Sequence, residues 1–231
     1  LRSSTPRRVA GLGGQWLRRT HITTEGSVGR VERPIVRQVV LATRNQHKID
    51  EVTRILAGAG TEIDVLALPA DAPEVVESGA TFAANAMLKA RSAAAHTGLV
   101  SIADDSGLCV DALNGMPGVL SARWAGTHGD DAANLALLVA QLVDVVPVRR
   151  GAQFVCAAAV VDPRSGDERV VEGVLEGRIG TEARGLNGFG YDPIFIPDGA
   201  ELTTAQLQPG EKDAMSHRGS AFRAVAALLV L

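Results

Sequence analysis

The chain has 231 residues, of which 46% are apolar, so it is long enough to bury a sizeable core in one large domain or two small ones. Aromatic residues make up only 3%, which argues against a single-strand nucleic-acid platform built on stacking. No apolar run approaches the ~18 residues that a membrane-spanning helix needs. Cys109 and Cys156 lack zinc-site spacing, so we expect reduced core thiols of a cytoplasmic protein.

The net charge of −3 combines two populations of charge. Residues 1–38 hold eight arginines against Glu25 and Glu32, a balance of +6, which leaves 15 basic and 24 acidic side chains, or −9, in the rest. Residues 1–36 show neither helical nor strand periodicity, so we expect a disordered Arg-rich extension, whose composition also fits an organellar targeting segment. Residues 37–231 are expected to form a single domain, too acidic to bind nucleic acid non-specifically.

Hydrophobic periodicity predicts alternating strands and helices along the folded part. The predicted strands are 38–42, 63–68, 100–103, 151–161 and 168–178, and the predicted helices are 46–57, 80–97, 130–146 and 219–230. The turn residues of 162–167 join the last two strands into an antiparallel hairpin. Strands that alternate with helices, together with one hairpin, indicate an α/β fold with a mixed sheet.

Lysine is rare in this chain: Lys48, Lys89 and Lys212 stand against twenty arginines. Because the lysine ammonium is a compact, strongly hydrated charge, it suits phosphate oxygens in a tight pocket. Chance composition explains the count about equally well, so the neighbourhood of each lysine decides between the two.

Lys48 follows a segment in which a buried strand runs directly into a helix. Backbone N–H groups at a helix N-terminus bind anions, and Thr43, Asn45 and Lys48 add a hydroxyl, an amide and an ammonium. Thr43 or Asn45 also fits a simple helix cap, and capping is compatible with phosphate binding.

Lys89 shares one predicted helix face with Thr81 and Asn85, because four residues separate each from the next. Such a stripe is also typical of a solvated face. Glu77 stands at the entry of this helix, where a carboxylate also compensates the helix dipole.

Asp104 and Asp105 are expected at the carboxyl end of a short buried strand. Adjacent aspartates there are costly if unpaired, and ligands bind at that edge of an open α/β sheet. With Glu77 they supply hard oxygen ligands for Mg²⁺ and a base for an attacking water. A plain turn is the alternative.

Two later segments combine turn residues with ring or polar side chains. Residues 185–193 hold the only tyrosine between closely spaced glycines, which suits close approach to a flat ligand and stacking on a base, or simply a Gly-rich turn. Ser216, His217 and Arg218 precede the last predicted helix, where an anion or a polar base edge is well placed. A catalytic triad is excluded, because Ser216 and His217 are sequence neighbours and no nucleophile elbow is present.

Six motifs in chain order resemble those of the inosine/xanthosine triphosphate pyrophosphatases. They are T-x-N-x-x-K within 41–48, E-x-G-x-T-F-x-x-N-A-x-x-K in 77–89, ADDSG in 103–107, SAR in 121–123, GFGYDP in 188–193 and SHR in 216–218. The resemblance implies hydrolysis of ITP, dITP and XTP between the α- and β-phosphates, with Mg²⁺, to monophosphate and pyrophosphate. It also implies an elongated mixed central sheet flanked by helices, two lobes with a cleft between them, and a cytoplasmic homodimer without nucleic-acid or membrane partners.

The resemblance also assigns roles by motif. It implies catalysis by Asp105 and Lys89 and a metal site of Glu77, Asp105 and Asp104, and it leaves open which aspartate is the base. The substrate-binding residues that it implies are Thr43, Arg44, Asn45, Gln46, His47, Lys48, Ser106, Phe189, Gly190, Tyr191, Asp192, Lys212, His217 and Arg218.

Two residues depart from the family pattern. Arg44 stands where a small residue is frequent, and there it either alters phosphate geometry or points to solvent; Asp213 stands where Asn is frequent. Three alternatives remain open: a related pyrophosphatase with another base specificity, a nucleotide-binding regulatory module without catalysis, and a nucleic-acid-binding protein acting through residues 1–36.

Overall fold

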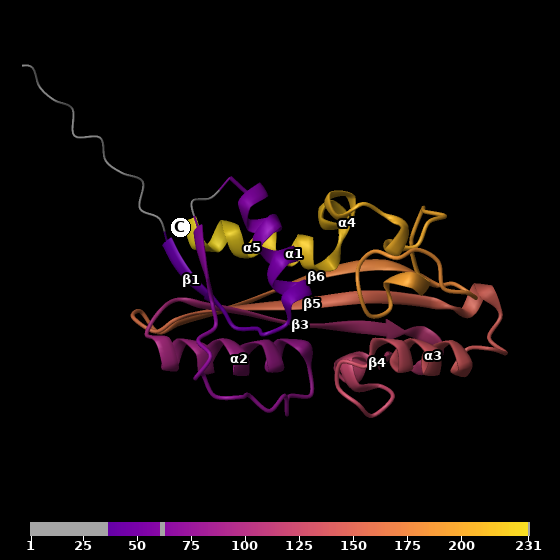
Figure 1. Cartoon of the computed structure of the whole chain (residues 1–231), viewed down its shortest axis with the longest axis horizontal. Coiled ribbons are helices and arrows are strands. Elements are labelled where there is room, and N and C mark those ends of the chain that lie inside the picture. Colours follow the sequence, from indigo (N-terminus) through magenta and orange to yellow (C-terminus); the bar gives the residue numbers. More distant parts are fainter. Residues whose placement is uncertain (1–36, 61–62, 231) are drawn as a thin grey trace, which may run out of the picture. The chain divides into compact units, whose positions relative to one another are not determined.

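The computed structural model describes residues 37–60 and 63–230, and the extension expected over 1–36 lies outside the described residues (Figure 1). The strands are β1 (Arg37–Leu41), β2 (Ile63–Ala67), β3 (Ser101–Val110), β4 (Met116–Pro117), β5 (Gly151–Asp162), β6 (Asp167–Ile179) and β7 (Phe195–Pro197). The α-helices are α1 (Gln46–Gly58), α2 (Phe82–Thr97), α3 (Asp131–Gln141), α4 (Pro209–Met215) and α5 (His217–Val230). Short 3₁₀ turns lie between them: η1 (Asp111–Leu113), η2 (Gly118–Arg123), η3 (Pro147–Arg149), η4 (Asp192–Ile194) and η5 (Thr204–Gln206).

All the strands of the described residues belong to one mixed sheet. Its order is β2-β1-β3-β5-β6-β7, with β4 added beside β3. β1 is parallel to β2 and β3, whereas the other pairs are antiparallel. The prediction of an α/β fold with a mixed sheet and one long hairpin, β5–β6, is therefore confirmed.

Helices cover both faces of the sheet (Figure 1). Apolar side chains of α1 and α5 pack with Ile102 and Cys156 on one face, and the alanines of α2 pack with Ala103 and Ala157 on the other. The small side chains of α2 allow it to lie close against the strands, which removes apolar surface from water on both partners.

A third core region occupies the other end of the long strands. It joins Leu108, Val110 and Phe154 to residues of α3 and to Tyr191 and the strand β7. β3 and β5 thus pass through two core regions in succession. The polar run of β3, Asp104 to Ser106, lies between those regions, which places the polar residues at a boundary inside the fold.

One glycine of β6 is required by the packing of α5. A Cβ at Gly173 would collide with the carbonyl oxygen of His217, at the first residue of the helix. The absence of a side chain therefore lets the helix start directly against the sheet.

The predicted boundaries were wrong at three places. The strand expected over 100–103 continues to Val110, because every residue from Ser101 to Val110 pairs with β5. Consequently Asp104 and Asp105 lie within the strand and not at its end. The helix expected to reach 146 ends at Gln141, the last helix begins at His217, and α4 was not predicted. Within the described residues, no helix has the length and apolarity needed to cross a membrane.

Candidate active site

The site lies beside a part of β3 that pairs with a strand on one edge only. β1 pairs with β3 only at Ser101 and Ile102, and β4 joins the same edge at Cys109. Between them, β3 has β5 on one side and no strand of the described residues on the other. A cavity of about 360 Å³ opens at this gap, a size typical of small-ligand sites.

The two aspartates of the site point in opposite directions, because successive side chains of a strand alternate between its faces. Asp105 faces α2, where its Oδ2 accepts a hydrogen bond of 3.0 Å from the Asn85 amide. Asp104 faces α1 and α5, where its Oδ2 lies 2.9 Å from Lys48 Nζ and 3.4 Å from Arg218 Nε. Asp105 lines the cavity, and Asp104 does not.

Two carboxylates share the ammonium of Lys89 on the α2 side. Lys89 Nζ lies 2.7 Å from Glu77 Oε1 and 3.5 Å from Asp105 Oδ1. Burial opposes the charged form of Lys89, but the surrounding carboxylates outweigh it and raise the pKa of the ammonium. The predicted spacing of four along α2 is confirmed for Asn85 and Lys89, which meet the same aspartate.

The pKa values of these two carboxylates are displaced in opposite directions. Burial raises the pKa of Asp105, and the charge of Glu77 adds to that effect against the opposing effect of Lys89. Burial also disfavours the ionised form of Glu77, but Lys89 outweighs it and lowers the pKa of Glu77. A carboxylate of raised pKa beside one that stays ionised is typical of acid–base sites.

The donor set suits a hard divalent cation in part. Glu77 and Asp105 both line the cavity, and their carboxylate oxygens converge on one group, the ammonium of Lys89. Mg²⁺ takes one or two protein carboxylates together with waters and substrate phosphates, so these two residues fit it. In residues 37–60 and 63–230, no group of three acidic, His or Cys side chains lies close enough to hold an ion by itself.

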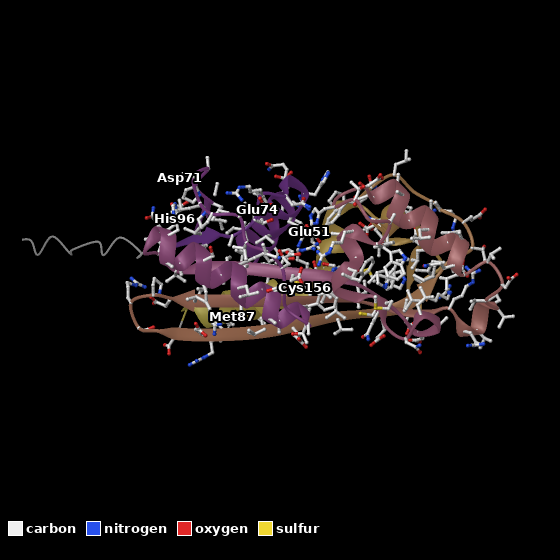
Figure 2. All side chains as sticks on the ribbon, turned by 90° about the horizontal axis from the view of Figure 1, so that it is seen from below. Glu51, Asp71, Glu74, Met87, His96 and Cys156 are labelled. Carbon is white, nitrogen blue, oxygen red and sulfur yellow. The ribbon has the colours of Figure 1, made fainter. Side chains whose placement is uncertain are left out.

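A buried ion network lies on the opposite face of β3. Arg218 Nη1 lies 2.6 Å from Glu51 Oε2, and the Arg218 side chain is only 2% exposed (Figure 2 labels Glu51). Although burial disfavours the ionised form of Asp104, Lys48 and Arg218 outweigh it and hold the pKa of Asp104 far below its usual range. This network fixes α1, β3 and α5 to one another, and its cations Lys48 and Arg218 also line the cavity.

The loop between β1 and α1 both caps the helix and lines the cavity. The Asn45 side chain accepts the backbone N–H of Lys48 at 3.3 Å, and the Thr43 hydroxyl accepts that of Asn45 at 3.1 Å. Thr43, Arg44, Asn45 and Lys48 all line the cavity. Capping is confirmed, and it leaves the lysine and the loop facing the cavity.

The segment around Phe189 is positioned by Asp192. The Asp192 carboxylate accepts hydrogen bonds from the Phe189 backbone at 2.8 Å and from the Thr204 hydroxyl at 2.7 Å. It also pairs with Lys212 Nζ at 2.6 Å. Lys212 in turn lies 5.3 Å from the centre of the Phe189 ring. The Tyr191 hydroxyl donates to the backbone carbonyl of Ser121, so this tyrosine fixes the wall of the cavity.

His217 is held neutral against an aromatic ring. Its ring stacks on Phe154 with centroids 4.8 Å apart and planes 12° apart. Burial, followed by the charges of Arg218 and Lys212, lowers its pKa well below the usual range. Its Nδ1 is buried and has no hydrogen-bond partner within the described residues, although the residue lines the cavity.

Most of the predicted site residues come together around the cavity. Those that line it are Thr43, Arg44, Asn45, Lys48, Glu77, Lys89, Asp105, Ser106, Phe189, Gly190, Tyr191, Asp192, Lys212, His217 and Arg218. Three others do not line it: Gln46 donates to Asp50 along α1, His47 stacks on Phe189 at 5.6 Å, and Asp104 lies on the far face.

Several lining residues were missed by sequence reasoning. They include the segment 72–75, His128, Asp131 and Phe154, whereas Ser121 was named only as part of a motif. Asp131 Oδ2 accepts the backbone N–H of Gly190 at 2.8 Å. Arg123, named only as part of a motif, lies 3.6 Å from Glu77 Oε2. No spacing rule indicates these contacts, because they join segments that are distant in sequence.

The cavity lies at the boundary of two core regions and is lined by both lysines and carboxylates. This combination is typical of enzymes that act on a polyanionic ligand. The chain belongs to the Ham1 family, whose model matches residues 39–228. It is 58% identical over 197 residues to a dITP/XTP pyrophosphatase of Frankia alni, which covers 83% of this chain and 96% of that protein. A dITP/XTP pyrophosphatase of Nocardia farcinica is 58% identical over 189 residues, covering 80% and 91%.

Solved structures of similar proteins share the fold of this chain. The nucleoside-triphosphatase / dITP/XTP pyrophosphatase of Mycobacterium abscessus superposes with a TM-score of 0.67 at 55% identity and covers 84% of this chain and 100% of that chain. A HAM1 protein of Coxiella burnetii gives a TM-score of 0.76 at 40% identity over 84% of this chain and 99% of that one.

Proposed function

We propose that the chain is a pyrophosphatase for deaminated purine nucleoside triphosphates, converting ITP, dITP and XTP to the monophosphate and pyrophosphate. The observation that carries the proposal is the pairing of Asp105, of raised pKa, with Glu77 and Lys89 in a cavity that also holds two further lysines. The high identity to curated dITP/XTP pyrophosphatases over most of both chains supports the substrate class.

The lysines bind and orient the phosphates. Lys48 and the loop residues Thr43 and Asn45 approach from one wall, Lys89 from α2 and Lys212 from α4. Cations that come from three elements hold a flexible polyphosphate in one geometry, which lowers the entropic part of the barrier. Their charge also stabilises the negative charge that develops on the leaving pyrophosphate.

Asp105 is the proposed general base. It takes a proton from the attacking water, whose oxygen forms the new bond to phosphorus while the bond to the bridging oxygen breaks and pyrophosphate leaves. Asn85 fixes the orientation of this carboxylate by donating a hydrogen bond to its Oδ2. Glu77 and Asp105 would hold Mg²⁺, which neutralises phosphate charge and polarises the phosphoryl oxygens when it is bound.

Base recognition is assigned to the wall that carries Phe189, His217 and Arg218. The Phe189 ring lines the cavity and is expected to stack on the base, and its backbone N–H is held by the Asp192 carboxylate. A purine with a 6-oxo group requires a donor where adenine requires an acceptor, and a site with placed donors rejects the wrong edge because its own groups stay unpaired. Arg218 is a permanent donor of this kind.

Three further properties belong to the proposal: a homodimer, a cytoplasmic location and the absence of nucleic-acid or membrane partners. The segment after α3 supports the first, because Val143, Val146 and Val148 are exposed apolar side chains close together in sequence. Light scattering at micromolar concentration tests it, and a monomer mass contradicts it.

Product analysis tests the reaction. Hydrolysis of ITP followed by ³¹P NMR should give IMP and pyrophosphate in equal amounts. Formation of IDP and phosphate would place the cleavage at the other anhydride and contradict the proposal. Binding of ITP without turnover would favour the regulatory module.

A further inference from the structure

Residues 68–81, which connect β2 to α2, form a strap along one wall of the cavity. Within the described residues, the backbone hydrogen bonds of this strap are local: Ala72 donates to Pro69, Ser78 donates to Val76, and Thr81 accepts from Asn85 in the first turn of α2. Its position therefore depends on side chains of other elements. Such segments, with few backbone bonds to their surroundings, open at low free-energy cost.

Most of the anchors of the strap come from α2. Asp71 lies beside His96, 3.4 Å from its Nε2 (Figure 2). The Asn85 side chain accepts the backbone N–H of Gly79 at 2.7 Å, and Lys89 binds Glu77. These contacts fix the two ends of the strap but not residues 72–76.

Arg44 holds the middle of the strap from the other wall. Its Nη2 donates a hydrogen bond of 2.6 Å to the backbone carbonyl of Ala72, a residue that is 6% exposed. A buried carbonyl without a partner is costly, so this bond stabilises the packed position of Ala72. The contact joins the strap to the loop of Thr43 and Asn45, which is proposed to bind phosphate.

Arg44 differs from most other arginines near the site in having no acidic partner. Arg218 pairs with Glu51 and Arg54 with Asp213, whereas Arg44 forms no ion pair within the described residues. A guanidinium carries five N–H donors in a planar fork. One N–H is bonded to a neutral carbonyl, so the charge of Arg44, which lines the cavity, is not neutralised by a carboxylate of the described residues.

We propose that Arg44 is a positioning residue that ties the strap to the phosphate-binding loop and thereby sets the position of Glu77. This rests on the proposed function for the role of Glu77, but the tie itself is a property of the free protein. Glu77 follows Ala72 by five residues, and its carboxylate is bound by Lys89 and Arg123, so the bond of Arg44 to Ala72 is the nearest hydrogen bond to another element on the N-terminal side of Glu77. Arg44 thus acts on the metal through the strap and not by contact with it.

The test compares Arg44→Met, which keeps length and removes the donors, with Arg44→Lys, which keeps a donor and the charge. Arg91→Met is the matched control, because Arg91 pairs with Glu168 on the exposed face of α2, outside the cavity. Hydrogen–deuterium exchange of peptides covering residues 70–79 is measured in the substrate-free protein. Mn²⁺ binding to the substrate-free protein is measured by calorimetry.

Arg44→Met should speed exchange over residues 70–79 about fivefold, the effect of one lost hydrogen bond. It should weaken Mn²⁺ binding about tenfold, as loss of a residue that orients a metal ligand does. Arg44→Lys should lie close to the wild type in both, and Arg91→Met should change neither.

Unchanged exchange and unchanged Mn²⁺ binding in Arg44→Met, with a raised KM alone, would overturn the proposal and leave Arg44 as a substrate contact. If the wild-type protein binds no Mn²⁺ or fails to hydrolyse ITP, the proposed function is contradicted. The exchange measurement alone then decides whether Arg44 ties the strap.

Discussion

Asp104 and Asp105 are adjacent in the chain, but their side chains lie on opposite faces of the sheet. The Asp104 carboxylate is enclosed between Lys48 and Arg218, and the Asp105 carboxylate faces the cavity beside Lys89. The fold holds the pKa of Asp104 low and raises that of Asp105. One aspartate is therefore stabilised as an anion within the structure, and the other is destabilised as an anion at the site of chemistry.

This difference predicts opposite results for the same substitution at the two positions. Asp105→Asn should lower kcat about a hundredfold or more by removing the base, while the unfolding free energy changes by less than about 1 kcal/mol. Asp104→Asn should lower the unfolding free energy by about 3 kcal/mol, because it leaves Lys48 without its carboxylate and Arg218 with Glu51 alone. Urea denaturation and steady-state kinetics on both variants measure this. Equal destabilisation by the two variants would contradict it.

Removal of divalent cations should abolish hydrolysis, and Mg²⁺ should restore it. Glu77→Gln should raise the Mg²⁺ concentration needed for half-maximal activity about tenfold, because it removes a charged ligand. Glu74→Gln is the control, since Glu74 lines the same cavity on the same strap and forms no ion pair with the part of the chain that the structure describes. Full activity after treatment with EDTA would contradict a requirement for Mg²⁺.

Gly173→Ala should destabilise the fold by about 1–3 kcal/mol, the cost of overpacking. The new Cβ would meet the His217 carbonyl, so α5 must shift at the residue that carries the base-reading wall. Gly58→Ala is the matched control, because nothing lies within 4 Å of its Cβ position at the end of α1. Thermal unfolding of both variants distinguishes the close contact from a general effect of glycine replacement.

The lowered pKa of His217 predicts how the unfolding free energy depends on pH. Its pKa is lowered in the folded state, so between that value and about 6.5 the unfolded chain binds more protons than the folded one. The unfolding free energy should therefore fall as the pH drops below about 6.5, by up to about 1.4 kcal/mol per pH unit from this group.

Urea denaturation between pH 7.5 and 5.5, in steps of about half a unit, measures that slope. His217→Gln should flatten it, whatever the variant loses in absolute stability. His96→Gln, which changes the imidazole beside Asp71, should retain it. A slope that persists in His217→Gln would assign the proton uptake to another group.

Local patterns predicted most of the fold. The apolar run 38–42, the helical spacing of Ile49, Val52 and Ile55, and the turn at 162–167 each specify their own element, and the structure confirms those elements. The full length of β3 was not predictable from pattern, because its polar residues interrupt the apolar run. Only pairing with β5 along its whole length makes that segment a strand.

The predicted helix at α3 was too long, whereas the predicted strand at β3 was too short. The apolar residues Val143, Val145 and Val146 continue a helix-like pattern, but the helix ends at Gln141 and Val143 is 72% exposed. Apolar spacing alone does not reveal whether a core is present to receive the next turn.

The motifs predicted the main contributors to the site but not how they divide between the two faces. Asp104 and Asp105 were interpreted together, since their alternation matters only when they lie inside a strand. The contacts of Arg44 with Ala72 and of Arg123 with Glu77 join distant segments, so they required the structure.

The preference for deaminated purine nucleotides is tested most directly by pyrophosphate release in the presence of Mg²⁺, comparing kcat/KM for ITP and XTP with kcat/KM for ATP and GTP. We expect a preference of about a hundredfold or more for ITP and XTP, which corresponds to about 2.8 kcal/mol in the transition state. Equal and slow turnover of all four nucleotides would contradict it.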